Sequence, residues 1–101
     1  MREINNNNFN DETKEGIVLV DFWANWCGPC KMLTPVLEQL SSEMKDVKFF
    51  KVNVDENGEL AQQFRIASIP TVMIFKNGEV VDKMMGFKPK NQVEEFLKKH
   101  I

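Results

Sequence analysis

The chain has 101 residues, of which 43% are hydrophobic and 28% charged, and its formal net charge at pH 7 is −2. That length predicts one domain, residues 1–101, with the composition of an ordinary soluble globular protein. The slight negative charge argues against nucleic acid as a partner, because proteins that bind nucleic acid are usually basic. No long uninterrupted apolar run occurs, so no membrane-spanning helix and no membrane association are expected.

The N-terminal segment, MREINNNNFNDETKEG, is polar and lacks the apolar stretch of a signal peptide. We therefore expect a cytoplasmic protein, and in that compartment paired cysteines are more often catalytic or metal-binding than structural. The Asn5–Asn8 run predicts a turn or a helix cap, because Asn side chains compete for local backbone hydrogen bonds. A short helix is expected from Phe9 to about Lys14.

Residues 17–23, IVLVDFW, form an apolar run that is rich in β-branched and aromatic residues and is interrupted only by Asp21. Such a run is typical of a central strand that is covered on both faces. Apolar side chains at helical spacing then predict an amphipathic helix over residues 28–44. Residues 47–53 predict a second strand, and residues 56–64 a short helix.

The last third of the chain predicts a hairpin and a helix. Residues 71–75 and 80–85 are expected as strands on either side of KNGE, whose Asn-Gly pair is a strong hairpin signal. A final helix is expected to start near Pro89. Strands joined through helices are expected to be parallel, with right-handed crossovers, and the hairpin adds antiparallel strands. The predicted fold class is α/β, a central mixed sheet with helices on both faces.

The only two cysteines, Cys27 and Cys30, lie in WCGPC, directly after the first long strand. Three roles are open to the pair: a structural staple, half of a metal site, or a reversible redox switch. As a staple it is weak, because so small a loop contributes about 2 kcal/mol by the loop-entropy relation, against about 3 kcal/mol for a 15-residue loop. A structural zinc site needs four ligands, and His100 is the only further Cys or His in the chain.

The redox role fits the place of the pair in the predicted elements. Cys27 is expected near the helix N-cap and Cys30 at the end of the first turn, so that their Cα atoms lie about 5–6 Å apart, which suits a disulfide. The free N–H groups of a helix start lower the pKa of a thiol at Cys27. Gly28 is expected to let the backbone turn without a Cβ, and Pro29 to stiffen the first turn without breaking a hydrogen bond. A C-x-x-C pair beside a βαβ pattern therefore indicates redox chemistry.

Two segments resemble the signatures of the thioredoxin family. DFWANWCGPCK, residues 21–31, is similar to its active-site segment, and SIPTVMIFKNGEV, residues 68–80, is similar to its second signature. The resemblance implies the thioredoxin fold. It also implies a monomeric thiol-disulfide oxidoreductase that reduces disulfide-containing protein substrates, needs no bound cofactor or metal, and is recharged by a thioredoxin reductase.

Carried over by position, the resemblance makes Cys27 the exposed nucleophile and Cys30 the more buried, resolving thiol. It makes Asp21 the general base for Cys30, because burial raises the pKa of a carboxyl group into a useful range. The alternative is that Asp21 faces solvent at a strand edge. Lys51, in the next strand, is expected to tune Asp21. Pro70 is expected to follow a cis peptide bond and to face the dithiol.

The expected substrate-binding surface consists of Trp26, Gly28, Pro29, Ile69, Pro70 and Gly86. The Ile69 backbone is expected to pair with an extended substrate segment, as in strand addition. Trp23 is expected to pack beneath the site. Asn25 and Gly58 depart from the common family pattern, and Asn25 adjoins the dithiol.

Two other functions stay open on the sequence. One is an oxidant or isomerase, although Gly-Pro between the cysteines favours the reducing role. The other is a non-catalytic scaffold or binding subunit of a larger complex, which would work without its cysteines.

Overall fold

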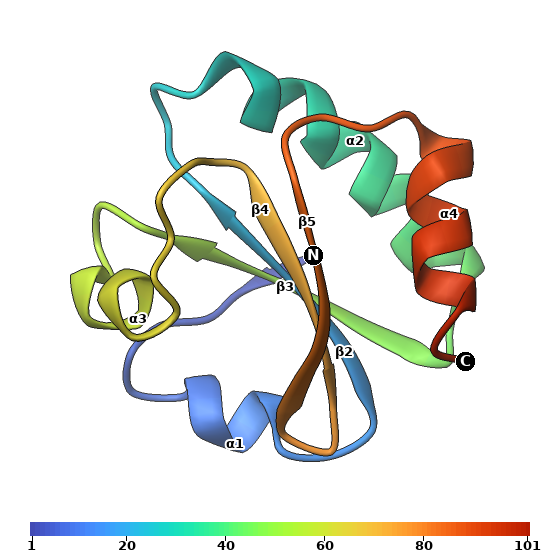
Figure 1. Ribbon diagram of the computed structural model, residues 1–101, viewed down its shortest axis with the longest axis horizontal. Helices are drawn as coiled ribbons and strands as arrows, with labels where there is room; N and C mark the ends of the chain where they lie inside the picture. Colours follow the sequence, from blue (N-terminus) through green and yellow to red (C-terminus); the bar gives the residue numbers. More distant parts are fainter.

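The computed structural model describes residues 1–101 and forms one five-stranded sheet with four helices (Figure 1). The strands are β1 (Arg2–Glu3), β2 (Ile17–Trp23), β3 (Val47–Asn53), β4 (Thr71–Lys76) and β5 (Glu79–Met85). The helices are α1 (Phe9–Thr13), α2 (Gly28–Glu43), α3 (Gly58–Gln63) and α4 (Lys90–Lys98). The strand order is β1-β3-β2-β4-β5, which confirms the predicted α/β class with a mixed sheet. None of the helices is long and apolar enough to cross a membrane.

The direction of β4 corrects one expectation. β2 and β3 are parallel and are joined through α2, as expected. β4 runs antiparallel to β2 although α3 connects it to β3, so the rule that helix-linked strands are parallel is wrong here. A six-residue helix is only about 9 Å long, whereas the seven residues of β3 span about 23 Å. Because α3 cannot return the chain along the sheet, β4 enters from the end at which β3 leaves.

The predicted hairpin between β4 and β5 is confirmed. Lys76 pairs with Glu79, which leaves Asn77 and Gly78 as a two-residue turn. Both have positive φ, 51° for Asn77 and 89° for Gly78, as this tight turn requires. The Asn77 side chain also accepts a hydrogen bond from the Gly16 backbone N–H at 3.0 Å and so joins this turn to the start of β2.

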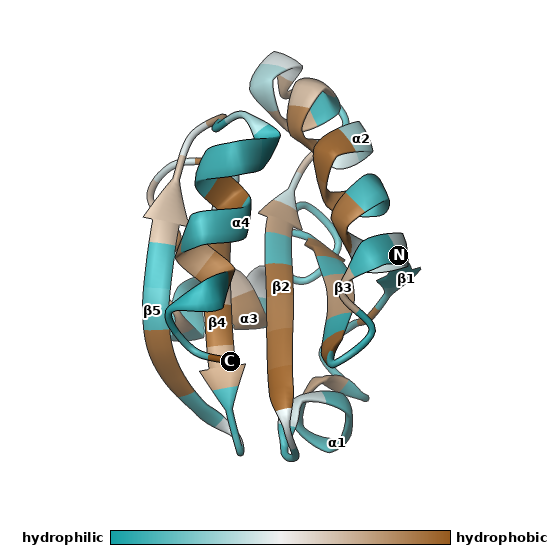
Figure 2. Ribbon diagram, turned by 90° about the vertical axis from the view of Figure 1, so that its right-hand side faces the viewer, coloured by the Kyte–Doolittle hydropathy of each residue, from teal (hydrophilic) through white to brown (hydrophobic).

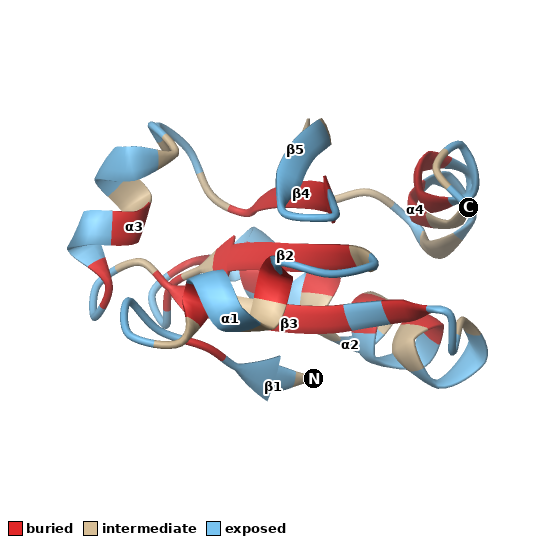
Figure 3. Cartoon of the chain, turned by 90° about the horizontal axis from the view of Figure 1, so that it is seen from below, coloured by how far each residue is buried: buried red, intermediate tan, exposed pale blue.

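The sheet separates two apolar layers, one on each face (Figures 2 and 3). α2 and α4 cover one face over eleven buried apolar residues, and α1 and α3 cover the other over ten. Alternation along β2 places Val18, Val20 and Phe22 in the second layer and Leu19 in the first. Asp21 therefore points toward the layer beneath α2, whose first turn carries the dithiol.

The helices follow the predicted periodicity. α2 buries Leu33, Leu37 and Leu40 and continues through Pro35 as far as Glu43. α4 follows Pro89, as expected, and buries Val93, Phe96 and Leu97. α3 is shorter than the predicted span of residues 56–64.

The N-terminal segment contains a strand that the sequence does not predict, because the two exposed residues of β1 carry no strand pattern. β1 pairs in parallel with β3 and places Glu3 beside Lys51. The Asn run that follows forms the predicted turn. The Asn8 side chain accepts from the Asn5 N–H at 2.8 Å, and the Asn5 side chain accepts from the Asn8 N–H at 3.1 Å.

Candidate active site

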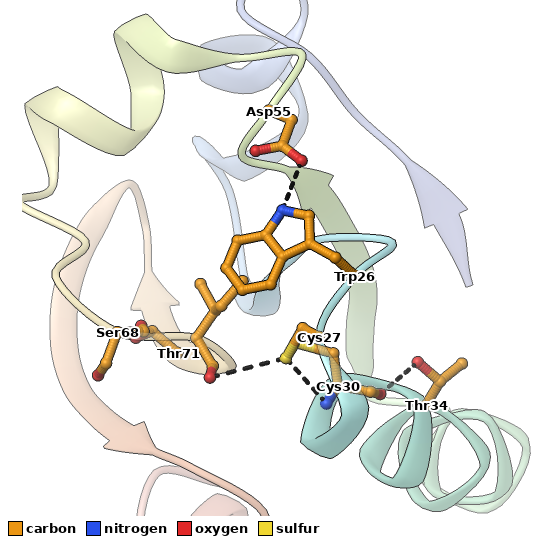
Figure 4. Close-up of a disulfide and its surroundings, with 8 residues drawn as sticks. Trp26, Cys27, Cys30, Thr34, Asp55, Ser68 and Thr71 are labelled. Atoms are coloured by element: carbon orange, nitrogen blue, oxygen red, sulfur yellow. Dashed lines mark hydrogen bonds between the residues drawn. A yellow bond between two sulfur atoms is a disulfide. The ribbon is translucent and has the colours of Figure 1, made fainter.

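Cys27 and Cys30 form a disulfide at the first turn of α2, with their Cα atoms 5.3 Å apart, as expected. Cys27 is the N-cap of α2, and its Sγ accepts a hydrogen bond from the Cys30 backbone N–H at 3.2 Å (Figure 4). Pro29 lies in the first turn, where the missing N–H breaks no helical hydrogen bond. The Thr34 hydroxyl donates to the Cys30 carbonyl at 3.0 Å, one turn further along the helix.

The burial of Cys27 corrects a second expectation. In this disulfide form Cys27 is 4% exposed and Cys30 is 1% exposed, so Cys27 is not an exposed group. The two cysteines form a small cluster with neighbouring side chains of the site, namely Trp23, Ala24, Val54 and Ile69. The expected packing of Trp23 beneath the site is confirmed.

Gly28 corrects a third expectation. Its φ lies outside the left-handed region, and a Cβ there would meet nothing within 4 Å. The backbone therefore does not require glycine at this position, and the proposed turn without a Cβ is not the reason for it. Both Gly28 and Pro29 are exposed next to the disulfide. A side chain at residue 28 would project into open space.

The loop before β4 faces the disulfide. The Ile69–Pro70 peptide bond is cis, as the resemblance implies, and Pro70 is buried. The Ile69 carbonyl oxygen lies 3.7 Å from Cys27 Sγ. The Thr71 hydroxyl donates to the Ser68 carbonyl at 2.6 Å and ties the two ends of this loop together.

Gly86, directly after β5, is tied to the same loop. Its backbone N–H donates to the Pro70 carbonyl at 2.8 Å, and its φ of +82° lies in the region that favours glycine. The structure thus brings Gly86 together with Ile69 and Pro70 beside the dithiol. Their role in binding substrate stays a prediction.

Trp26 is 71% exposed, which agrees with its expected place on a contact surface. Its indole N–H donates to Asp55 Oδ2 at 2.9 Å (Figure 4). Next to it lies a pocket of about 480 Å³, lined by Trp26, Val54, Ala61, Ile66, Ala67, Ser68 and Ile69. Sequence reasoning missed Asp55 and this pocket. No pattern in the sequence marks them, because they meet Trp26 only through the packing of α3 beside the site.

Asp21 is fully buried, which excludes a position at a solvent-exposed strand edge. Burial raises the pKa of Asp21 from 3.8 to about 7, and the nearby positive charge of Lys51 opposes that rise. Neither carboxyl oxygen has a hydrogen-bond partner, and neither does the buried indole N–H of Trp23. A carboxyl group with a pKa near neutrality is matched to proton transfer at physiological pH.

Lys51 lies beside Asp21 in the register of β2 and β3. Its Nζ is 4.9 Å from the centroid of the Trp23 ring and 3.9 Å from Glu3 Oε1. The ion pair of Lys51 is therefore with Glu3, and its influence on Asp21 is that of a neighbouring charge. The tuning role of Lys51 stays a prediction, although the direction of its effect agrees with it.

His100, the residue considered for a zinc site, bonds elsewhere. Its Nε2 lies 2.9 Å from Asp82 Oδ2 on β5. No group of three or more His, Cys, Asp or Glu side chains is arranged to hold a metal ion.

Comparisons of the sequence and of the structure with known proteins both identify thioredoxins as similar proteins. The thioredoxin family model matches residues 1–99. The thioredoxin of Bacillus subtilis is 54% identical over 94 residues, covering 92% of this chain and 90% of its own length. That of Listeria monocytogenes is 46% identical over 102 residues, covering 100% and 99%. The solved thioredoxin of Plasmodium falciparum superposes with a TM-score of 0.93 at 32% identity and 100% coverage of both chains. That of Malassezia sympodialis gives 0.91 at 37% identity, covering 98% of this chain and 91% of its own.

Proposed function

Because the chain belongs to the thioredoxin family, whose members are thiol-disulfide oxidoreductases, we propose that it is a general protein-disulfide reductase. The observation that carries the proposal is the Cys27–Cys30 disulfide at the first turn of α2, with the Ile69 carbonyl and an apolar pocket beside it. The proposed setting is the cytoplasm, the proposed state is a monomer, and a thioredoxin reductase returns the oxidised protein to the dithiol.

The reaction proceeds in two exchanges. The Cys27 thiolate attacks one sulfur of a substrate disulfide, a mixed disulfide forms, and the first substrate thiolate leaves. The Cys30 thiol then gives its proton to Asp21 and attacks Cys27 Sγ, which closes the protein disulfide and releases the second substrate thiolate. The two substrate thiolates take protons from water. The second exchange is fast because both sulfurs are held within one helical turn.

The local dipoles favour the first exchange. In the oxidised form the Cys30 backbone N–H already donates to Cys27 Sγ, and the same donor would stabilise a thiolate there. The carboxyl group of Asp21 favours the second exchange. With a pKa of about 7 it is partly ionised at neutral pH, and the ionised form can accept a proton.

Recognition of substrates is proposed to be mainly through the main chain. The Ile69 backbone N–H makes no hydrogen bond within the protein and is free to pair with an extended substrate segment. Trp26, Gly28 and Pro29 are exposed and are proposed to contact the substrate, together with Gly86, whose N–H bonds to the carbonyl of the buried Pro70. Main-chain pairing tolerates different side chains, which suits a reductase that acts on many proteins.

The test is reduction of insulin disulfides in the presence of dithiothreitol. The wild-type protein should accelerate the reduction, and Cys30→Ser should lose turnover while it accumulates mixed disulfides through Cys27. A Cys27→Ser variant should do neither and serves as the matched control. A wild-type protein that does not accelerate the reduction would point instead to a non-catalytic scaffold.

A second measurement separates reductase from oxidant. When the protein is equilibrated with glutathione buffers, the potential of the Cys27–Cys30 couple should lie below the cytosolic glutathione poise. A strongly oxidising couple would assign the protein to the oxidants or isomerases.

A further inference from the structure

α3 begins without a capping side chain of its own. Asn57 occupies its N-cap position, yet the Asn57 side chain makes no capping hydrogen bond. Asn6, from the turn before α1, supplies the missing acceptor, because its Oδ1 accepts from the Leu60 backbone N–H at 3.3 Å. Leu60 is the third residue of α3, and its N–H is one of those that an N-cap side chain normally satisfies. A residue distant in the sequence therefore caps this helix.

The side chain of Asn57 is used for a different purpose. It is buried, its Oδ1 accepts from the Asn6 backbone N–H at 3.0 Å, and its Nδ2 donates to the Asn53 carbonyl at 3.0 Å. Asn53 ends β3 and is also buried, and its Oδ1 accepts from the Asp55 backbone N–H at 2.9 Å. A series of hydrogen bonds thus leads from the backbone N–H of Asn6 through Asn57 and Asn53 to the backbone N–H of Asp55.

This series ends at the substrate-facing surface. Asp55 accepts the hydrogen bond of the Trp26 indole, and Figure 4 shows the indole nitrogen directed at Asp55 with the dithiol on the other side of the ring. Val54, between Asn53 and Asp55, lines the apolar pocket, and so does Ala61 of α3. The Asn6–Asn57 contact therefore supports two walls of the surface without touching either cysteine.

We propose that Asn6 and Asn57 are positioning residues for protein substrates, which hold α3 and the Asn53–Asp55 turn so that Asp55 fixes the Trp26 indole beside the dithiol. The inference rests on the proposed reductase function. Asp55 is exposed, and a short exposed turn loses its order easily once its hydrogen bonds are removed. Loss of this order weakens the binding of substrates that contact Trp26 and the pocket. It leaves the rate of the thiol–disulfide exchange itself unchanged.

The first test separates binding from chemistry. Asn6→Ala removes the cap on Leu60, and Asn57→Ala removes both side-chain bonds of that residue. Each should raise KM for insulin about three- to tenfold, as expected for the loss of one or two hydrogen bonds, and change kcat less than about twofold. Reduction of the small disulfide 5,5′-dithiobis(2-nitrobenzoate), which does not need the pocket, should be unchanged.

Two further variants supply the controls. Asn6→Asp keeps an oxygen acceptor for the Leu60 N–H, so KM for insulin should stay at the wild-type value. Asn8→Ala removes a hydrogen bond to Asn5 in the same turn but outside the series, so it should leave KM unchanged. A rise in KM with Asn8→Ala equal to that with Asn6→Ala would overturn the proposal, because any disturbance of the turn would then suffice.

The second test observes Trp26 directly by NMR. Asn57→Ala, which breaks the series, and Asn6→Ala, which removes the cap of α3, should each speed the solvent exchange of the Trp26 indole N–H, assigned with Trp26→Phe, and leave that of the buried Trp23 indole unchanged. In a double-mutant cycle, adding Asn6→Ala to Asp55→Ala should raise KM no further. If Asn6→Ala lowers stability but leaves both KM and indole exchange unchanged, Asn6 is a helix cap only. A wild-type protein unable to reduce insulin would refute the proposed function, while the exchange rates would still decide whether Asn6 positions Trp26.

Discussion

The two faces of the sheet are packed with similar apolar side chains, but only the face beneath α2 contains a buried carboxyl group. On the α1 and α3 side the core contains no buried carboxyl group, and Phe9 and Phe75 meet edge to face with their ring centroids 5.4 Å apart. On the α2 and α4 side, Asp21 is as fully buried as Phe22, its neighbour in β2. Phe22 gains stability from its burial, whereas Asp21 gains no hydrogen bond and has a raised pKa. Apolar burial stabilises the fold on both faces, and on the α2 face the buried carboxyl group of Asp21 opposes that stabilisation.

The largest expected effect on stability comes from breaking the apolar face. Phe22→Ala should lower the free energy of unfolding by about 3–5 kcal/mol, because it empties a fully buried aromatic site that packs against Phe64. Urea unfolding at neutral pH measures the loss. The milder truncation Phe22→Leu is the control and should cost less than Phe22→Ala, because it removes fewer buried carbon atoms. A low cost for Phe22→Ala, or lost activity in its folded fraction, would contradict the division between the faces.

Removing the buried carboxyl group should change how stability depends on pH. The folded pKa of Asp21, about 7, lies above its ordinary value of 3.8, so the unfolded chain ionises first as the pH rises. Asp21 therefore destabilises the fold progressively from about pH 4 to pH 7, by on the order of 4 kcal/mol in total. Asp21→Asn should abolish this downward slope. Parallel stability curves for the two proteins across that range would show that Asp21 is not the titrating group.

The charge beside Asp21 should have a smaller effect. Lys51 lowers the pKa of Asp21, so Lys51→Met should raise the titration midpoint of the Asp21 carboxyl group by about one unit. NMR of the carboxyl carbon follows the titration. Glu3→Gln is the matched control, because it removes the ion-pair partner of Lys51 and leaves the ammonium free to act on Asp21. The midpoint should then stay or fall, and a rise equal to that of Lys51→Met would contradict the tuning role.

The smallest effect is expected at the rim of the sheet, where Asp82 bonds to His100. That hydrogen bond lowers the pKa of Asp82, which is the opposite of the shift at Asp21. Asp82 therefore contributes stability above its unfolded pKa and loses that contribution as the pH falls. Because the pair is only partly buried and remains in contact with solvent, Asp82→Asn should cost less than about 1 kcal/mol near neutral pH and nothing in strong acid. Thermal unfolding at both pH values provides the check.

Local patterns were sufficient to predict most elements and the dithiol. Three patterns determine the structure of the residues that contain them. They are the apolar run of residues 17–23, the helical spacing after Cys27 and the Asn-Gly pair at residues 77–78. The same holds for the Cα separation of the two cysteines, which follows from their spacing at a helix start. Such features depend only on neighbouring residues, and for that reason they can be predicted from the sequence.

What the sequence could not predict depends on contacts between distant segments. β1 exists because β3 offers an edge to two charged residues, and the direction of β4 depends on the length of α3. The burial of Cys27 arises from Val54 and Ile69, which belong to other segments. Asn6 could be identified as part of a turn, but its bond to Leu60 appears only when α3 is packed.

That Asp21 accepts the proton of Cys30 is tested most directly by the pH dependence of the resolving exchange, followed by stopped-flow in single turnovers with a substrate disulfide. In the wild-type protein the rate should rise with pH with a midpoint near 7, where Asp21 ionises. In Asp21→Asn that midpoint should disappear and the rate at neutral pH should fall about 10²-fold, the usual contribution of a general base. Superimposable profiles for the two proteins would contradict the role of Asp21.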